Sequence, residues 1–319
     1  MKKIPIVFAF DGNYALPASI AIKSLTENKN TETEYEIIIF HNGLSQQTKS
    51  KMAEICSVRW IEVDETILNE APSSYRLPLS VYYRLFIANL LPEYDKVIWS
   101  DVDVLFKGDL SSVYNTDMQG YDWAGVVAEK QSETNGVHTH FPENNKEFIY
   151  MSGFMVVNTK LWREKKMLNR FLEIIKTYEN RLKMFDLDVL NLASDKIKAV
   201  PFEYCVLENI YDNDNIKNAP EYPWLSNVYS DEDLIKAKQY PMIIHYAGAP
   251  VKIWKRKFAD IPEYYRDYIT SSSFYDKAFY FPDMKRKTLV FLITVLQKLC
   301  FVKKYRNKLK RIKKNLVSR

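Results

Sequence analysis

The sequence predicts an α/β domain with a mostly parallel central sheet and helices on both of its faces. Strand and helix patterns alternate through the first half of the chain, which is typical of parallel sheets. The first strand, Ile4–Phe10, is an unbroken apolar run, as expected for a strand buried on both faces. At 319 residues and 47% hydrophobic content, the chain is long enough for one large domain or two small ones.

The elements of the first half follow from local patterns. After the first strand, Asp11-Gly12-Asn13 predicts a turn, and Pro17 suits the first turn of a helix. Ser45 is a suitable cap for a later helix. The alternation then predicts a helix over Ala18–Leu25, a strand over Tyr35–Phe40, a helix from Ser45 to about Ile55, a strand over Val58–Val63, a helix over Val81–Leu90 and a strand over Lys96–Ser100.

The second half contains four further features. The polar segment Glu129–Lys146 holds His138 and His140 and is expected to be a surface loop or lid. In Phe148–Asn158 we expect a turn at Ser152-Gly153 leading into a strand. An acidic turn opening a helix is expected over Met184–Asn191, and an apolar strand beginning at Met242 and ending in His245.

The charge is unevenly distributed along the chain. Of the 45 basic residues, thirteen lie in Lys285–Arg319, which contains no acidic residue. The other 32 face 40 acidic residues, which leaves the body with a net charge of −8 although the whole chain carries +5. This pattern argues against a nucleic-acid-binding surface and favours an acidic body with a basic anchor.

The basic tail itself predicts membrane association. Thr288–Val302 is apolar but interrupted by Gln297 and Lys298, so it is too short for a span of roughly 20 residues. Lys303–Lys314 then adds eight basic residues. We therefore expect a domain over residues 1–275 and, over 276–319, a helical amphipathic tail lying on an anionic membrane surface. A solvated helix packed on the body is the alternative.

Three scattered cysteines (Cys56, Cys205 and Cys300) predict neither a disulfide framework nor a cysteine-based zinc site, and they favour a reducing cytoplasm. The apolar run near the N-terminus is too short for a signal peptide.

Two aspartates at the end of a predicted strand suggest a metal site. Asp101 and Asp103 follow Val97–Ser100, and residues i and i+2 of an extended chain point the same way. Two carboxylates suit Mg²⁺ or Mn²⁺, which commonly share oxygens with substrate phosphates. Two turn-forming or capping aspartates are the alternative. Neither a GxGxxG motif after the first strand nor a P-loop motif is present.

Several motifs in order resemble glycosyltransferase family 8, the retaining enzymes of GT-A fold that include bacterial lipopolysaccharide galactosyl- and glucosyltransferases and glycogenin. The resemblance covers about residues 4–255. It rests on Asp11-x-Asn13-Tyr14, the pair Tyr83-Arg84, the D-x-D of Asp101 and Asp103, the acidic turn at Asp186, and His245-x-x-Gly248 followed by Lys252-x-Trp254.

The resemblance implies a UDP-sugar donor, UDP-galactose or UDP-glucose, and a Mn²⁺ (or Mg²⁺) cofactor. It implies metal ligation by Asp101, Asp103 and His245, although a lone histidine after an apolar run is also compatible with a core residue. Other implied roles are uridine binding by Asp11, Asn13 and Tyr14, diphosphate binding by Gly248 and Lys252, and donor contacts by Val102 and Ser152. Arg84, Asp186 and Asp188 would act on the donor sugar and phosphate. A solvated helix charge is the alternative for Arg84, and helix capping is the alternative for Asp188.

Three departures from the family pattern concern the sugar and the diphosphate. Met151 stands where many relatives have asparagine, and Leu187 where bacterial galactosyltransferases have glutamine. Leu187 therefore argues against a double displacement through that side chain. The spacing from His245 to Lys252 is one residue longer than usual.

The resemblance further implies a glycolipid or oligosaccharide acceptor, a role in lipopolysaccharide or other surface polysaccharide synthesis, and a peripheral location on the cytoplasmic face of the bacterial inner membrane. A metal-dependent phosphohydrolase of the haloacid-dehalogenase type also uses a D-x-D at a strand end, but its nucleophile normally follows the first strand. A degenerate, glycan-binding transferase at the membrane is the non-enzymatic alternative. The acceptor, the linkage and the oligomeric state have no sequence signal.

Overall fold

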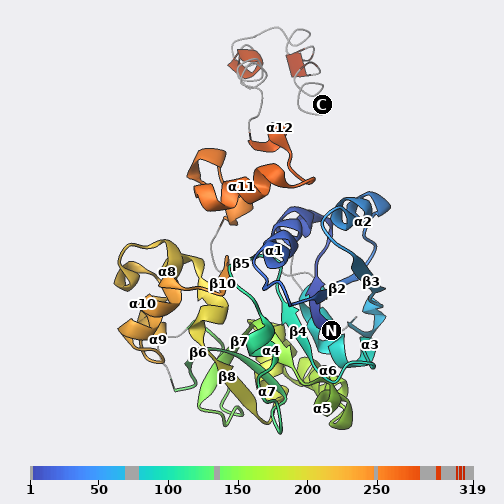
Figure 1. Ribbon diagram of the computed structural model, residues 1–319, viewed down its shortest axis with the longest axis vertical. Helices are drawn as coiled ribbons and strands as arrows, with labels where there is room; N and C mark the ends of the chain where they lie inside the picture. The colour runs from blue at the N-terminus through green and yellow to red at the C-terminus, as the bar shows by residue number, and fades with distance from the viewer. Residues whose placement is uncertain are drawn as a thin grey trace.

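The computed structural model describes residues 3–68, 79–132, 137–247 and 251–280, with 292–295, 307, 309, 310 and 312. Its body is a central sheet with helices packed on both faces (Figure 1). The strands of this sheet have the order β3-β2-β1-β4-β7-β6-β8. They are β1 (Ile4–Ala9), β2 (Tyr35–His41), β3 (Val58–Glu62), β4 (Val97–Ser100), β6 (Trp123–Lys130), β7 (Phe148–Val157) and β8 (Ile197–Val200).

The pairing of these strands is mixed and mostly parallel, as the sequence predicts. Strands β3, β2, β1 and β4 are mutually parallel, and so are β6 and β8. Strand β7 is antiparallel to both of its neighbours, β4 and β6. The four parallel strands therefore end at one edge of the sheet, where polar side chains after β1 and β4 come together.

A second sheet holds three short strands, β5 (Val104–Phe106), β9 (Val206–Leu207) and β10 (Ile243–His245). Strand β10 pairs antiparallel with β5 and parallel with β9. Because β5 follows β4 after only three residues, the second sheet begins where the first one ends. The sequence indicates the strand ending in His245, but it contains no signal for its two partner strands, which lie far away along the chain.

The main sheet has one apolar core on each of its two faces. On β1, Ile6 and Phe8 belong to one core and the intervening Val7 to the other, which is the alternation of a strand buried on both sides. The first core includes α1 (Ala15–Glu27) and α10 (Asp231–Gln239), and the second includes α6 (Met167–Tyr178) and α7 (Asp186–Ala193). The remaining α-helices are α2 (Gln46–Ala53), α3 (Ile87–Leu90), α4 (Ser111–Tyr114), α5 (Thr159–Glu164), α8 (Glu208–Asp212), α9 (Tyr222–Leu225), α11 (Glu263–Ser271) and α12 (Lys277–Tyr280).

The predicted helix over Val81–Leu90 is helical throughout, as a 3₁₀ helix, η3 (Leu79–Phe86), followed by the single turn of α3. Its valine and two tyrosines lose rotamer freedom in an α-helix, which weakens the preference for α-helical over 3₁₀ geometry. Two other local predictions are wrong. Ser152-Gly153 is not a turn but lies inside β7, where a side chain from another sheet approaches Gly153. Glu129 belongs to β6 and is fully buried, not part of a surface loop.

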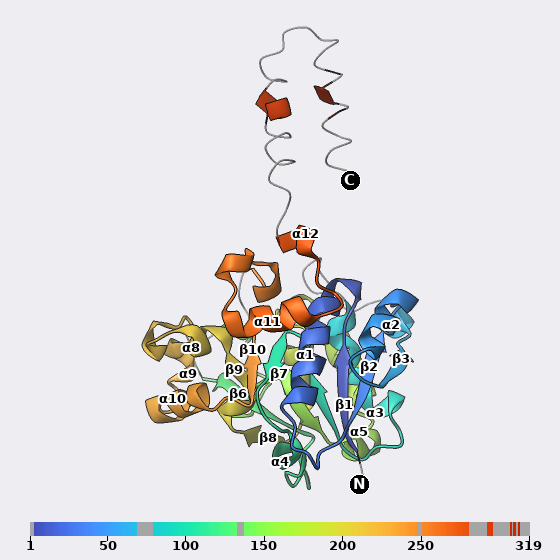
Figure 2. The same cartoon turned by 45° about the horizontal axis from the view of Figure 1, so that its top comes forward.

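The helices α11 and α12 lie at one end of the body, close to α1 (Figure 2). Tyr280 on α12 packs into the body: it is 8% exposed, and its hydroxyl donates to the carbonyl of Trp254 at 2.6 Å. Within the described part of the chain, every helix is too short or too polar to span a bilayer. Most of the predicted tail over 276–319 lies outside the described residues.

Candidate active site

Asp101 and Asp103 lie where the two sheets meet. Asp101 follows β4, and its backbone N–H donates to the carbonyl of Gly153 on β7 at 2.8 Å. The carbonyl of Asp103 accepts from the backbone N–H of Tyr246, just after β10, at 2.9 Å. The backbone of Asp101 is thus held by the main sheet and that of Asp103 by the second sheet.

His245 completes a three-residue cluster with these aspartates. Its Nε2 lies 3.3 Å from Asp103 Oδ1 and 3.8 Å from Asp101 Oδ2. Ligand atoms of the three side chains all lie within 4.8 Å of one another, and His245 is buried. Two carboxylates and an imidazole form a donor set suited to Mn²⁺, so the residues present fit a divalent cation.

Two contacts hold the imidazole of His245 in place. Its Nδ1 lies 3.3 Å from the Sγ of Cys205, a buried residue just before β9. Gly153 lies against the Cε1–Nδ1 edge of the ring, where a Cβ would overlap with His245. Partners of the distal ring nitrogen orient metal-binding histidines. The sequence gives no indication of Cys205 because its neighbour is 40 residues away.

Lys252 lies at the Asp103 side of the cluster despite its longer spacing from His245. Its Nζ is 2.7 Å from Asp103 Oδ2 and 3.0 Å from the carbonyl of Tyr246. Burial acts to raise the pKa of Asp103, but its hydrogen bond to His245 and the charges of His245 and Lys252 outweigh burial and hold the pKa below its usual range. Asp103 is therefore ionised at neutral pH. The other predicted diphosphate residue, Gly248, lies outside the described residues.

Arg84 organises the opposite side of the cluster. Arg84 is only 5% exposed, and its guanidinium lies 2.7 Å from Asp101 and 3.1 Å from Asp186 and donates to the carbonyl of Ser152 at 2.6 Å. Its Cζ also lies 4.8 Å from the ring centre of Trp99. Arg84 is thus not a solvated helix charge but a buried cation shared by two carboxylates.

Asp186 lies beside this cation at the first position of α7. Its Oδ2 also accepts from the Ser152 hydroxyl at 2.8 Å. Burial raises the pKa of Asp186 to about 6, although Arg84 acts in the opposite direction. The Asp186 carboxylate is therefore poorly solvated and lies next to the D-x-D pair, an environment common at functional sites.

Asp188 has a different environment. Its Oδ2 accepts from the backbone N–H groups of Lys183 and Met184, at 2.8 and 2.9 Å, and from the Thr139 hydroxyl at 3.1 Å. These bonds fasten the turn before α7, in which Phe185 has a positive φ of 47°. They give Asp188 a structural role in that turn and do not cap the first N–H groups of α7, and a direct role on the sugar stays a prediction.

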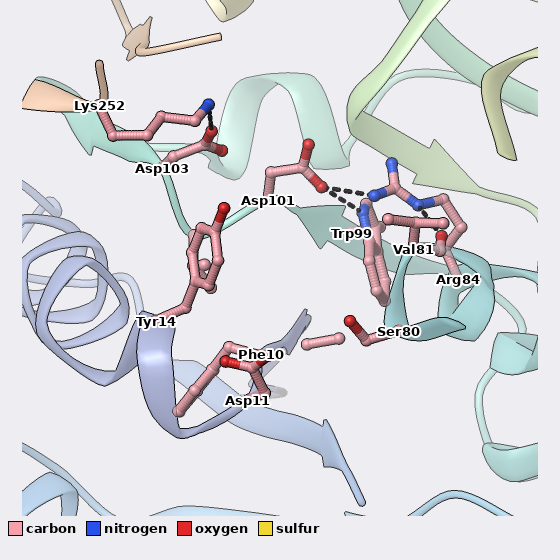
Figure 3. Close-up of a pocket in the computed structure, with 12 residues that line it drawn as sticks. Phe10, Asp11, Tyr14, Ser80, Val81, Arg84, Trp99, Asp101, Asp103 and Lys252 are labelled. Atoms are coloured by element: carbon pink, nitrogen blue, oxygen red, sulfur yellow. Dashed lines mark hydrogen bonds and ion pairs between the residues drawn. The ribbon is translucent and has the colours of Figure 1, made fainter. Parts of the chain in front are cut away.

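A pocket of about 200 Å³ opens beside the cluster (Figure 3). Its lining includes the predicted residues Asp11, Tyr14, Asp101, Val102, Asp103, Arg84 and Lys252, together with Trp99, Ser80 and Val81, which the sequence does not single out. Figure 3 shows Asp101 between Asp103 with Lys252 on one side and Arg84 with Trp99 on the other. Asn13 is exposed and lies outside this lining, so its predicted contact stays untested.

A second pocket of about 450 Å³ shares Asp101 with the first and also includes Ser152 and His245. His138 lines it too, packed against Trp224 with ring centres 5.7 Å apart. His138 and His140 both contact the buried Glu129, so the segment around them is anchored to β6. The cluster therefore lies between the first pocket and a second, larger one.

Two solved glycosyltransferases have a similar fold. The galactosyltransferase LgtC, solved with donor and acceptor sugar analogues, has a TM-score of 0.66 at 21% identity over 83% of this chain and all of that one. The bifunctional glycosyltransferase WbbM has a TM-score of 0.64 at 22% identity, over 85% of this chain and half of that one. These likenesses define the fold as GT-A-like.

The family model of glycosyl transferase family 8 matches residues 5–257, so the chain belongs to that family. It is 26% identical to the lipopolysaccharide 1,2-glucosyltransferase of Escherichia coli K12 over 281 residues, covering 85% of this chain and 79% of the relative. It is also 26% identical to general stress protein A of Bacillus subtilis over 198 residues, 58% of this chain and 67% of that protein. Another lipopolysaccharide 1,2-glucosyltransferase of Escherichia coli is matched over 66% of its length. Membership implies a glycosyltransferase that uses a nucleotide-sugar donor and a divalent metal.

Proposed function

We propose that this protein is a retaining hexosyltransferase that moves galactose or glucose from UDP to a glycan acceptor. The observation that carries the proposal is the cluster of Asp101, Asp103 and His245, whose ligand atoms lie within 4.8 Å of one another. Around it, Lys252 and Arg84 supply fixed positive charge on two sides. This arrangement suits a diphosphate bound through a cation.

The first pocket is the proposed nucleotide site. Tyr14 offers an aromatic face for the base and packs against Trp254, with ring centres 5.6 Å apart. Asp11 lines the same pocket and offers a carboxylate to the base or ribose. A bound Mn²⁺ would supply Lewis-acid stabilisation of the diphosphate. Lys252 would add positive charge as the leaving UDP becomes more negative.

Retention is proposed to follow from attack on the face that UDP leaves. The bond between the anomeric carbon and the β-phosphate oxygen breaks, the acceptor oxygen bonds to that carbon, and its proton passes to the departing phosphate. Asp186, 3.1 Å from Arg84, is in position to hold sugar hydroxyls and to stabilise the positive charge that develops on the ring. Leu187 has no nucleophilic atom, which supports this route over a double displacement.

The acceptor is proposed to be a glycolipid or oligosaccharide of lipopolysaccharide or another surface polysaccharide. Three relatives support this class: two lipopolysaccharide 1,2-glucosyltransferases and the lipopolysaccharide 1,3-galactosyltransferase of Salmonella typhimurium, which is 24% identical over 60% of this chain and 59% of its own length. The thirteen basic residues after Met284 support a peripheral position on the cytoplasmic face of the inner membrane.

Release of UDP tests the proposal against its two alternatives. Purified protein with Mn²⁺ should release UDP from UDP-galactose or UDP-glucose, and release should increase when an acceptor glycan is added. A phosphohydrolase would cleave phosphate esters without a UDP-sugar. A glycan-binding protein would bind the acceptor and release no UDP, and either result would contradict the proposal.

A further inference from the structure

The second pocket has a wall that is unusual for a cavity expected to hold hydroxyl-rich sugars. Met151, Met184, Leu187 and Trp224 line it together with Leu207 and Pro220. Met151 and Trp224 are each only 6% exposed, so their contact atoms are fixed by packing. Sugar hydroxyls facing this wall would lose water without gaining a hydrogen bond, which disfavours their binding.

One polar residue in this wall, Glu221, has a carboxylate oxygen without a hydrogen-bond partner among the described residues. Glu221 lines the pocket, and its Oε1 accepts from the Asn209 side chain at 2.8 Å. Its Oε2 is buried and has no hydrogen-bond partner among the described residues. Because this oxygen has less than 1 Å² of exposed surface, a donor on a ligand in the pocket reaches it when the Glu221 side chain turns toward the cavity.

An acetamido group matches both features at once. It carries an N–H that donates to a carboxylate oxygen and a methyl group that packs on methionine, leucine or tryptophan. A bare hydroxyl can satisfy Glu221, but it leaves the apolar wall uncovered. We propose that the second pocket binds a sugar ring carrying an N-acetyl group. The inference rests on the proposed function, because the pocket shares Asp101 and His245 with the proposed metal site.

Two substrates could bring this ring to the pocket. The donor sugar is bonded to the phosphate beside Asp101, so a UDP-N-acetylhexosamine would place its ring next to Ser152 and Met151. The acceptor ring must also reach the anomeric carbon, and the volume of about 450 Å³, more than twice that of the first pocket, accommodates a second sugar. In the first case an N-acetylhexosamine replaces the galactose or glucose of the proposed function as the transferred sugar, whereas in the second case the donor remains UDP-glucose or UDP-galactose.

Calorimetric titration with Mn²⁺ present tests the proposal in two arms. The donor arm compares UDP-N-acetylglucosamine and UDP-N-acetylgalactosamine with UDP-glucose and UDP-galactose. The acceptor arm compares methyl glycosides of the N-acetylated and the parent hexoses on the protein saturated with UDP. In one arm the N-acetyl form should bind at least about tenfold more tightly, the lower end of what one small apolar group contributes in an apolar pocket.

Substitutions of residues that line the second pocket test whether its apolar wall causes the N-acetyl preference. Leu187→Asn and Met151→Gln, similar in size to the native residues, should reduce the N-acetyl preference in the arm that shows it. Glu221→Gln should weaken binding of the N-acetyl form. Leu192→Asn is the matched control, because Leu192 is also half-buried on α7 but lies outside the pocket lining, and it should keep the preference.

The outcomes separate this inference from the proposed function. Equal affinity for N-acetylated and parent sugars in both arms, with UDP bound normally, would overturn the inference alone. A preference that survives in both Leu187→Asn and Met151→Gln, each with an unchanged melting temperature, would also overturn it. Failure of UDP itself to bind in the presence of Mn²⁺ would contradict the proposed function instead.

Discussion

Gly153 on β7 and His245 on β10 approach each other so closely that no side chain fits between them. A Cβ at Gly153 would come well within 3.0 Å of His245 Cε1 and 3.2 Å from Asp101 Oδ2. Real Cβ atoms essentially never approach other heavy atoms within 3.0 Å. The glycine therefore sets the separation between the main sheet and the histidine of the cluster.

Gly153→Ala should accordingly weaken Mn²⁺ binding by displacing His245. We expect at least a tenfold rise in the Mn²⁺ dissociation constant, within the range seen when groups that orient metal ligands are changed. Titration calorimetry with Mn²⁺ measures the effect. Gly12→Ala is the control, because nothing lies within 4 Å of a Cβ there. Overlapping titrations of Gly153→Ala and wild type would show that His245 does not ligate the metal.

Arg84→Lys should impair both stability and transfer. A lysine ammonium cannot serve Asp101, Asp186 and the Ser152 carbonyl together, so a buried acceptor loses its partner at a cost of about 1–3 kcal/mol. Turnover should fall on the order of 100-fold, as when a charge-stabilising donor is removed. Chemical denaturation and UDP release measure the two effects. Arg170→Lys, at an exposed ion pair with Asp195, should change neither quantity.

Asp186→Asn should separate stability from activity. Because burial raises the pKa of Asp186 to about 6 in the folded protein, the fold favours the protonated carboxyl. The contribution to stability is complete below the unfolded value near 3.8 and is lost as the pH rises through about 6. The variant should therefore melt higher than wild type at pH 7.5 and lose most of this advantage near pH 4. Its transfer activity should be strongly reduced at every pH. A variant with wild-type turnover would exclude Asp186 from the reaction.

Truncation after Tyr280 should leave a folded enzyme that no longer binds membranes. The cut keeps the hydrogen bond of Tyr280 to Trp254 and removes all thirteen basic residues of the tail. The full chain should sediment with anionic vesicles and dissociate as salt is added, because surface charges are screened within ~8 Å near physiological ionic strength. Equal binding to neutral and anionic vesicles would contradict an electrostatic anchor. Activity of the truncated protein on a small acceptor serves as the control.

The sequence predicts the parallel part of the sheet well because β1, β2 and β4 are apolar runs whose pattern is local. It also predicts that Asp101, Asp103 and His245 come together, because strand-end acids and a strand-end histidine appear in an ordered set of motifs. It does not predict Cys205 beside His245 or Glu221 in the second pocket. Those contacts depend on how β9, β10 and the segment after α8 pack, and sequence spacing carries no information on that packing. For the same reason the sequence predicts a turn at Gly153, whereas this residue lies inside β7, where His245 leaves no room for a side chain.

The most direct test of the metal site is the binding of UDP with and without Mn²⁺. Titration calorimetry of the wild-type protein should show UDP binding that depends on Mn²⁺ and disappears in excess chelator. Asp103→Ala should remove the Mn²⁺-dependent part of the affinity, and His245→Ala should raise the Mn²⁺ concentration that half-restores binding, while both variants keep the wild-type circular dichroism spectrum. UDP binding that is unchanged by chelator, or by Asp103→Ala, would contradict a diphosphate site built on Asp101, Asp103 and His245.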